Sequence, residues 1–306
     1  MVYREVSLRE DGSSVIKVFG LDPAISGGLR KKRPAIVICP GGGYLITAAK
    51  EQEPVAARFL GLGYQVFVLD YLTYFKSRPE TWGDEPDLRG DARYPEQLRD
   101  LMRTMAYVHA CAEELDIDEE RVYALGFSAG AHIVGSLVER WDDPDLLDGI
   151  KPEIARPCAV LLGYPMVDAD IQMGGGNAAS GDCADNPYAR YFKQGVFGID
   201  EPTKQAMSQL DLTAHVRSDM PRAFMWHTFD DGVAPAEKSL ALAARLMDAD
   251  VPVEYHLFQQ GGHGNALADA TSAARAYEIE PREAGWVQLA ASWLEMDDEQ
   301  KGYSHE

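Results

Sequence analysis

The chain has 306 residues, of which 46% are hydrophobic, enough to bury a large core within one domain. Its 29 basic and 49 acidic residues give a formal net charge of −20, which repels nucleic acid and anionic membrane surfaces at long range and favours neutral substrates. The sequence therefore predicts neither a nucleic-acid partner nor a membrane partner, and it leaves a homo-oligomer open.

The N-terminus and the cysteines predict a cytoplasmic protein. The first residues, MVYREVSLREDGSSV, contain no continuous apolar segment of a secretory signal. No apolar run approaches the roughly 18 residues that span a bilayer. The cysteines are scattered without a C-x-x-C pair, as expected of thiols in a reducing compartment: Cys39, Cys111, Cys158 and Cys183.

Short apolar runs recur along the chain and predict strands. The first two, residues 3–8 and 14–19, flank the turn sequence REDGS and predict an antiparallel hairpin. The later runs are continuously apolar rather than alternating, which is typical of strands buried on both faces of a parallel sheet. They cover residues 34–39, 64–70, 121–127, 158–164, 223–228 and 253–258.

Segments with helical spacing separate these runs. The clearest is 95–115, where apolar residues recur mostly at intervals of three and four and Pro95 stands at the start. Alternating strands and helices imply right-handed crossovers. We therefore expect a single α/β domain over 1–306, a three-layer sandwich with a mostly parallel, twisted sheet and helices on both faces.

Residues 165–210 differ from the rest of the chain. Their sequence, which includes GGGNAASGDCADNPYARYFKQGVFG, is rich in Gly, Asn and Asp and lacks long periodicity. We interpret it as an insertion after the sixth strand, over the carboxyl edge of the sheet. A partial lid and a plain surface excursion are both compatible with such a segment.

The motif G-F-S-A-G, residues 126–130, lies between a predicted strand and a segment with helical spacing. Strand, sharp turn and helix form the setting of a nucleophile elbow, which exposes a serine hydroxyl at the top of a sheet. Glycines flank the serine because side chains there would collide with the neighbouring strand or helix. The motif predicts Ser128 as a nucleophile, and a serine N-cap between glycines is the alternative.

A serine nucleophile needs a base, and His263 is the best placed of the seven histidines. It follows the run 253–258 almost directly, in the glycine-rich loop QQGGHGNAL. His132 lies in the helix just after Ser128, and His109 precedes Ser128 although the hydrolase order is serine, acid, histidine. The remaining histidines lie inside a strand, beside acids at a strand end, after the insertion and in the tail: His256, His227, His215 and His305.

The acid is expected at the end of the strand run 223–228, in HTFDDGVAP. Asp230 and Asp231 both stand there, and chain order fits either. Oxyanion donors are expected from the backbone N–H of Ala129 and from the loop C-P-G-G-G-Y, residues 39–44, whose glycines let the backbone approach a substrate. A phosphate-binding loop does not fit, because no G-K-[ST] follows, whereas a simple tight turn remains an alternative.

Taken together, PGGGY, VFVLDY, GFSAGAH, HTFDDGVAP and GGHG resemble the α/β-hydrolase esterases. The branch most similar is the one grouped with acetylxylan esterases and other small carbohydrate-ester or aryl-ester hydrolases, over about residues 34–295. In that family the acid lies in the pattern H-T-x-x-D-x-x-V-P, which favours Asp231 over Asp230. The chain departs from the family with Ala234 in place of the valine and with Ala131 in place of a glycine after the elbow.

The resemblance implies a role for each site residue. Ser128 is the nucleophile, His263 the base and acid, and Asp231 the residue that orients the histidine, while Gly42 or Gly43 donates to the oxyanion together with Ala129. No metal and no organic cofactor is implied. The expected function is a serine carboxylesterase acting on short acyl esters, acetyl esters especially, of small carbohydrates or related metabolites. A peptidase or an aryl-formamidase of the same fold, and a non-catalytic ligand-binding relative, are the alternatives.

Overall fold

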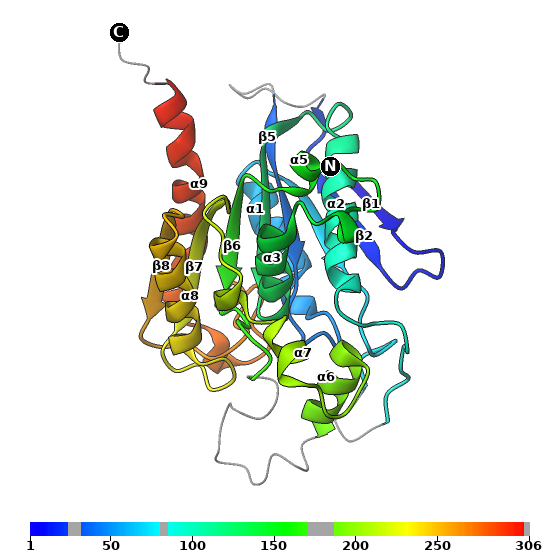
Figure 1. Cartoon of the computed structure of the whole chain (residues 1–306). Coiled ribbons are helices and arrows are strands. Elements are labelled where there is room, and N and C mark those ends of the chain that lie inside the picture. The colour runs from blue at the N-terminus through cyan, green and yellow to red at the C-terminus, as the bar shows by residue number, and fades with distance from the viewer. Residues whose placement is uncertain (24–31, 80–84, 171–186, 303–306) are drawn as a thin grey trace.

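An eight-stranded sheet organises the part of the protein that the computed structural model describes, residues 1–23, 32–79, 85–170 and 187–302 (Figure 1). Its spatial order is β1-β2-β4-β3-β5-β6-β7-β8. β1 pairs with β2 and β2 with β4 in antiparallel register, and all other pairs are parallel. The strands are β1 (Val2–Ser7), β2 (Val15–Gly20), β3 (Arg33–Cys39), β4 (Gln65–Asp70), β5 (Ile117–Phe127), β6 (Ala159–Gly163), β7 (Arg222–Thr228) and β8 (Val253–Phe258).

The sheet confirms the predicted N-terminal hairpin and the mostly parallel order of the later strands. Seven strands begin and end within one residue of the predicted runs, whereas β5 begins earlier, at Ile117. Because β3 to β8 run parallel to one another, their carboxyl ends meet at one edge, the lower edge of the sheet in Figure 1. Sites in α/β proteins form at this edge, because the loops that leave the strands converge there.

Helices cover both faces of the sheet, which confirms the three-layer sandwich (Figure 1). Side chains of α2, α3 and α8 share one buried apolar cluster with one face of the sheet, and those of α1 and α9 share a second cluster with the other face. The predicted helix 95–115 is α2 and ends earlier, at Ala110. The helices are α1 (Glu53–Gly61), α2 (Glu96–Ala110), α3 (Ala129–Arg140), α4 (Pro144–Leu147), α5 (Pro152–Ala155), α6 (Pro187–Phe197), α7 (Lys204–Ser208), α8 (Ala236–Asp248) and α9 (Trp286–Gly302).

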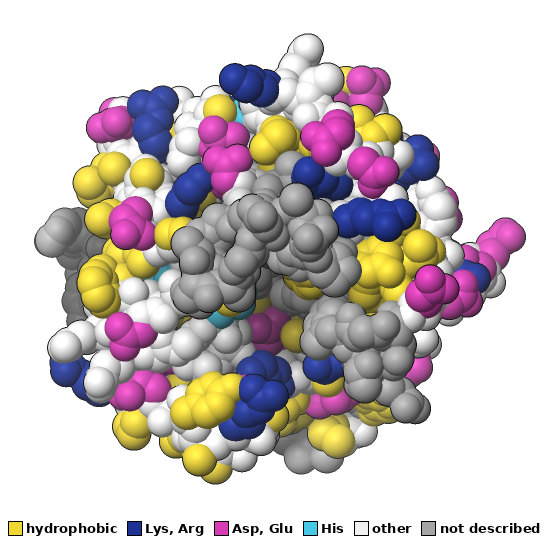
Figure 2. Space-filling model, turned by 90° about the horizontal axis from the view of Figure 1, so that it is seen from below, with side chains coloured by type: hydrophobic (Ala, Val, Ile, Leu, Met, Phe, Trp, Pro, Cys, Tyr) yellow, Lys and Arg dark blue, Asp and Glu magenta, His cyan; other side chains and the backbone are white. Residues whose placement is uncertain are grey.

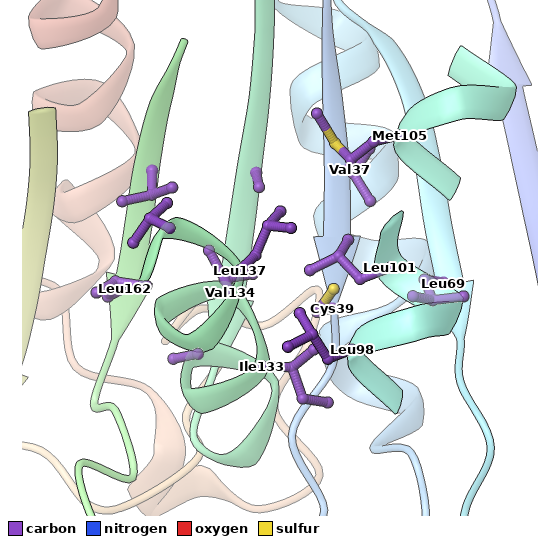
Figure 3. Close-up of a cluster of buried hydrophobic side chains, with 14 of the residues drawn as sticks. Val37, Cys39, Leu69, Leu98, Leu101, Met105, Ile133, Val134, Leu137 and Leu162 are labelled. Carbon is purple, nitrogen blue, oxygen red and sulfur yellow. The ribbon is translucent and has the colours of Figure 1, made fainter. Parts of the chain in front are cut away.

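The central strand β3 shows why its sequence is continuously apolar. Val37 and Cys39 point to the cluster formed with α2 and α3, where Figure 3 shows them against Leu98 and Leu101. Ile36, one position along, belongs to the opposite cluster. Every residue of a strand covered on both faces leaves water, so no position favours a polar side chain.

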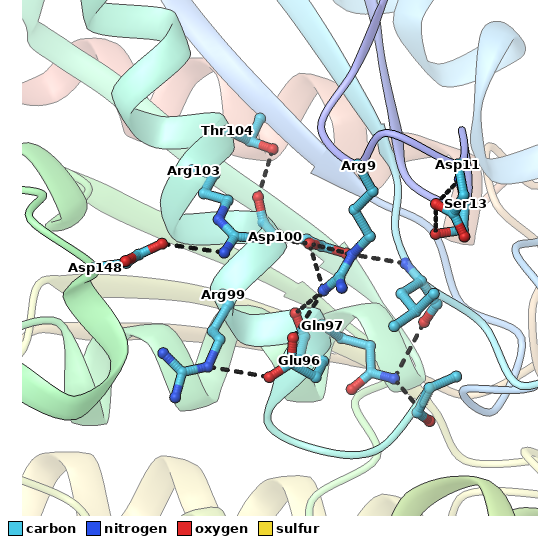
Figure 4. A network of polar contacts seen from close by, with 12 residues as sticks. Arg9, Asp11, Ser13, Glu96, Gln97, Arg99, Asp100, Arg103, Thr104 and Asp148 are labelled. Carbon is cyan, nitrogen blue, oxygen red and sulfur yellow. Dashed lines mark hydrogen bonds and ion pairs between the residues drawn. The ribbon is translucent and has the colours of Figure 1, made fainter. Parts of the chain in front are cut away.

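A buried polar network anchors the first turn of α2 (Figure 4). Arg9, from the turn between β1 and β2, donates from Nε to Asp100 Oδ1 at 3.0 Å. The backbone N–H of Leu72 donates to the other oxygen of Asp100 at 3.1 Å, and Gln97 Nε2 donates to the carbonyl of Leu72 at 3.1 Å. These bonds join α2 to the hairpin turn and to the chain that leaves β4.

The insertion after β6 contains regular structure. Residues 187–197 form α6 although the sequence of the insertion lacks long periodicity, while residues 171–186 lie outside the described part of the chain. Phe192 of α6 is buried and contacts Tyr44 of the loop after β3, with ring centroids 6.4 Å apart. The insertion therefore packs against the carboxyl edge of the sheet through α6, and its action as a lid stays a prediction.

Two sequence expectations concern membrane-spanning segments and cysteine pairing. Within the described ranges, no helix combines the length and apolar character needed to cross a bilayer. Cys39, Cys111 and Cys158 form no disulfide, and Cys183 lies outside the described residues.

Candidate active site

Ser128 stands between the end of β5 and the start of α3. Its backbone is left-handed, with φ 50° and ψ −117°, a conformation that costs energy for a residue with a side chain. The flanking glycines allow this turn: a Cβ on Gly126 would lie 2.4 Å from the carbonyl oxygen of Gly130, and a Cβ on Gly130 would lie 2.0 Å from that of Cys39. Ser128 is 5% exposed. Figure 2 views the molecule from below Figure 1, which is the side of the carboxyl edge of the sheet.

His263 meets Ser128 from the loop after β8. Its Nε2 lies 2.8 Å from Ser128 Oγ, within hydrogen-bonding distance. The Tyr164 ring and the imidazole pack edge to face, with centroids 5.1 Å apart and planes at 66°. The structure thus brings together the predicted nucleophile and the predicted base across the sheet edge.

Asp231, at the end of β7, lies behind His263. Its Oδ2 is 2.7 Å from His263 Nδ1, and its Oδ1 accepts the backbone N–H groups of Val233 and Ala234 at 2.8 and 2.9 Å. Burial alone would raise the pKa of Asp231, but hydrogen bonds from His227 and His263 hold it well below its ordinary value. The neighbouring Asp230 is exposed, so the structure places Asp231, and not Asp230, against the histidine.

The loop after β3 lies beside the nucleophile. A Cβ on Gly41 would be 2.9 Å from Ser128 Cβ, and Gly42 and Gly43 have positive φ angles of 127° and 64°. Within the described chain, the N–H groups of Gly42, Gly43 and Ala129 have no hydrogen-bond acceptor. Ala129 also begins α3, whose positive dipole end lies at Ser128. Unpaired backbone donors next to a nucleophile can bind a developing oxyanion.

His132 is not placed to act as the base for Ser128, because both of its ring nitrogens bind other groups. Its Nε2 lies 2.9 Å from the carbonyl oxygen of Leu210 and donates to it, so its Nδ1 accepts the hydroxyl of Tyr44 at 2.6 Å. Burial lowers the pKa of His132 to about 4, which keeps the ring neutral. His132 is a helix residue, as predicted, and it ties α3 to the loop after β3.

Glu51 and Tyr164 adjoin the site and were absent from the sequence prediction. Glu51 accepts hydrogen bonds from the N–H of Gly41 and from the hydroxyl of Tyr164. Neither residue carries a sequence signal, because Glu51 lies in a charged stretch that resembles a solvated helix start and Tyr164 ends an apolar strand run. Only the folded chain brings them together.

Comparisons with known proteins agree with the fold. The model of the BD-FAE family matches residues 21–246. The chain is similar to the carboxylesterase Cest-2923 from Lactobacillus plantarum, at 26% identity and a TM-score of 0.76, covering 97% of this chain and 98% of that one. It is also similar to the acetyl ester-xyloside bifunctional hydrolase from Caldicellulosiruptor lactoaceticus, at 27% identity and a TM-score of 0.69, covering 93% and 88%. The expected α/β-hydrolase fold is confirmed.

Similarity extends to longer proteins. The chain is 27% identical over 275 residues to endo-1,4-beta-xylanase B of Butyrivibrio fibrisolvens. The aligned region covers 87% of this chain and 38% of that protein. The chain spans about half or less of the length of the curated relatives it matches. The similarity therefore concerns one part of each of these relatives.

Proposed function

The chain belongs to the BD-FAE family, and on that premise we propose that it is a serine carboxylesterase that removes short acyl groups, acetyl above all, from esters of small carbohydrates or related metabolites. The observation that carries the proposal is the continuous contact Ser128–His263–Asp231, with distances of 2.8 and 2.7 Å. Nucleophile, base and orienting carboxylate come from three different loops at one sheet edge, the arrangement that acyl transfer by serine requires.

In the proposed reaction, Ser128 Oγ attacks the ester carbonyl while His263 Nε2 takes the hydroxyl proton. The carbonyl oxygen becomes an oxyanion and accepts hydrogen bonds from the N–H of Ala129 and from Gly42 or Gly43. His263 then gives its proton to the leaving alcohol, and the acyl group stays on Ser128. A water molecule, deprotonated by His263, releases the acid.

Asp231 keeps His263 in the productive tautomer. Because its Oδ2 accepts the Nδ1–H of His263, the Nε2 of the imidazole carries the lone pair that takes the serine proton. The ionised carboxylate also stabilises the imidazolium that forms during the reaction. The proposed steps use only side chains and backbone amides of this chain and need no cofactor.

The choice of substrate rests on the relatives and on charge. The similar proteins include a carboxylesterase, a xylanase and an acetyl ester-xyloside hydrolase, which favours acetylated sugars as substrates here. The net charge of −20 favours neutral esters over anionic ones. The cytoplasmic location and the open homo-oligomeric state stay predictions.

The proposal is tested with a substrate panel. Rates are measured on p-nitrophenyl acetate, butyrate and octanoate, an acetylated xylo-oligosaccharide, an acetanilide and N-formylkynurenine. We expect kcat/KM to be highest for the acetyl esters and to fall with acyl length. A preference for the amide or for N-formylkynurenine would instead identify a peptidase or an aryl-formamidase of the same fold.

Two serine variants accompany the panel. Ser128→Ala should lose about 10³-fold or more in kcat. Ser136 is a buried serine within α3, and Ser136→Ala should retain wild-type rates. Ester hydrolysis that survives Ser128→Ala would overturn the mechanism.

A further inference from the structure

Glu51 is a buried acid that the proposed reaction does not yet use. It is 2% exposed and ends the short 3₁₀ helix Ala49–Glu51 that precedes α1. Among the described residues it forms no ion pair with a basic side chain. Burial raises the pKa of Glu51, against the opposing effect of hydrogen bonds from Tyr164 and Gly41. Burying a carboxyl group costs stability, so its presence here requires a reason.

The two carboxyl oxygens of Glu51 hold two different elements. Oε2 accepts the backbone N–H of Gly41 at 2.5 Å, in the loop after β3. Oε1 accepts the hydroxyl of Tyr164 at 2.8 Å, just beyond the end of β6. A single side chain therefore joins the glycine loop after β3 to the end of β6, on the far side of β5 in the sheet.

Both partners of Glu51 pack directly against a residue of the proposed triad. Gly41 packs against Ser128, since a Cβ on Gly41 would lie 2.9 Å from Ser128 Cβ, and it precedes the unpaired donors of Gly42 and Gly43. The Tyr164 ring packs against the imidazole of His263 in an edge-to-face arrangement.

Tyr164 also holds the chain beyond His263. Its hydroxyl accepts the N–H of Ala266 at 3.1 Å, three residues after the imidazole. Gly264 lies on the same side, because a Cβ there would be 3.8 Å from Glu51 Oε1. The histidine loop is thus tied to Glu51 through one tyrosine hydroxyl.

We propose that Glu51 is a positioning residue: it fixes the glycine loop after β3 and, through Tyr164, the His263 loop, in the relative geometry that the transition state requires. This inference rests on the proposed esterase function. The hydrogen bonds of Glu51 go to Gly41 and Tyr164 rather than to Ser128 or His263, so it acts through the backbone of Gly41 and the side chain of Tyr164. A neutral amide cannot accept both hydrogen bonds with equal strength, so charge as well as size matters at this position.

The test uses Glu51→Gln and Tyr164→Phe, with steady-state kinetics on an acetyl ester and the dissociation constant of a trifluoromethyl ketone. Ser128 Oγ adds to the carbonyl carbon of the ketone, and the resulting oxyanion lies where the transition state has one. The affinity of the ketone therefore reports the geometry of the backbone N–H donors. We expect Glu51→Gln to lower kcat by about 10²-fold with KM changed less than about threefold, since small misplacements near the chemistry have effects of that size. Ketone affinity should fall in parallel.

Tyr164→Phe removes the hydrogen bond between Tyr164 and Glu51 Oε1 and leaves the one from Gly41, so it should lower kcat by about tenfold. The double variant should have the same kcat as Glu51→Gln alone, because the Tyr164 hydroxyl acts through its hydrogen bond to the Glu51 carboxylate. If Glu51→Gln fails to fold, Tyr164→Phe alone still tests the proposal through kcat and ketone affinity.

Glu278→Gln is the matched control. Glu278 is also buried, and its carboxylate accepts the N–H of Ala274 and pairs with Lys50 rather than with a residue of the triad. This variant should lose stability and keep wild-type kcat. Wild-type kcat and ketone affinity in Glu51→Gln, or a loss of thermal stability alone as in the control, would overturn the role of Glu51. A wild-type protein inactive on every ester would instead overturn the proposed function.

Discussion

At Asp231, one carboxylate is held by four hydrogen-bond partners. Oδ2 lies 2.7 Å from His263 Nδ1 and 3.0 Å from His227 Nε2, and Oδ1 accepts two backbone N–H groups. His227 is itself fully buried and fixed by Ser239, whose Oγ lies 2.8 Å from its Nδ1. A carboxylate with its acceptor sites occupied stays ionised and keeps one orientation, which is what an orienting residue must do.

This geometry predicts different roles for the adjacent Asp230 and Asp231. Asp231→Asn should lower kcat on an acetyl ester by about 10³–10⁴-fold, because an amide at that position favours the wrong tautomer of His263. Asp230→Asn should leave kcat within about twofold, since Asp230 is exposed. Steady-state rates of the two purified variants check this directly. Loss of activity in Asp230→Asn with full activity in Asp231→Asn would reverse the assignment.

The residues differ in how far the sequence could predict them. Ser128 and His263 lie in glycine-rich loops just after apolar strand runs, and that local setting is visible in the sequence. Asp230 and Asp231 have the same local setting, so only the family pattern favoured one. Glu51 could not be predicted, because its partners come from two loops that meet only in the folded chain.

At the scale of elements, the sharp turn from β5 into α3 depends on backbone packing against β3. A Cβ on Gly130 would lie 2.0 Å from the carbonyl oxygen of Cys39 and 2.5 Å from that of Pro40. Backbone atoms cannot move aside as the end of a side chain can, so α3 sits in contact with the end of β3 only with glycine at this position.

Two glycine-to-alanine variants in helices test this packing. Gly130→Ala should lower the free energy of unfolding by about 2–3 kcal/mol, because α3 or β3 must shift. Gly61→Ala, at the end of α1 with open space around the new Cβ, should raise it by up to about 1 kcal/mol. Urea denaturation of both variants measures the difference. Equal stabilities would show that the close approach is not rigid.

Elements also differed in predictability. The parallel strands other than β5 were predicted to within one residue at each end, because strands covered on both faces leave continuous apolar runs. α6 was missed, since it lies in a Gly- and Asn-rich insertion and gains burial from Phe192 packing on Tyr44. Such tertiary packing overrides weak local preference.

For the molecule as a whole, buried carboxyl groups link stability to pH. Glu283 is fully buried beside the histidine loop, and its Oε2 accepts the side-chain amide of Asn265 at 2.8 Å. Burial raises the pKa of Glu283 from 4.5 to about 7, partly opposed by that hydrogen bond. Between these values the folded protein holds a proton that the unfolded chain has lost. Stability from this group is therefore fully present below about pH 4.5 and is lost as the pH rises through 7.

Glu283→Gln should remove this dependence. Relative to the variant, the wild type should lose up to about 3 kcal/mol of unfolding free energy between pH 4.5 and pH 8. Urea denaturation of both proteins at several pH values across this range gives the difference curve, in which contributions from other groups cancel. If the unfolding free energy of the wild type minus that of the variant stayed constant or rose with pH, the raised pKa of Glu283 would be contradicted.

The central claim, that Ser128 is the nucleophile activated by His263 and Asp231, is tested most directly by covalent labelling with a fluorophosphonate followed by intact-mass and peptide mass spectrometry. The account predicts one adduct per chain, on Ser128, absent in Ser128→Ala and formed at least about 10³-fold more slowly in His263→Ala. No adduct on a protein that hydrolyses acetyl esters, or an adduct on another residue, would contradict it.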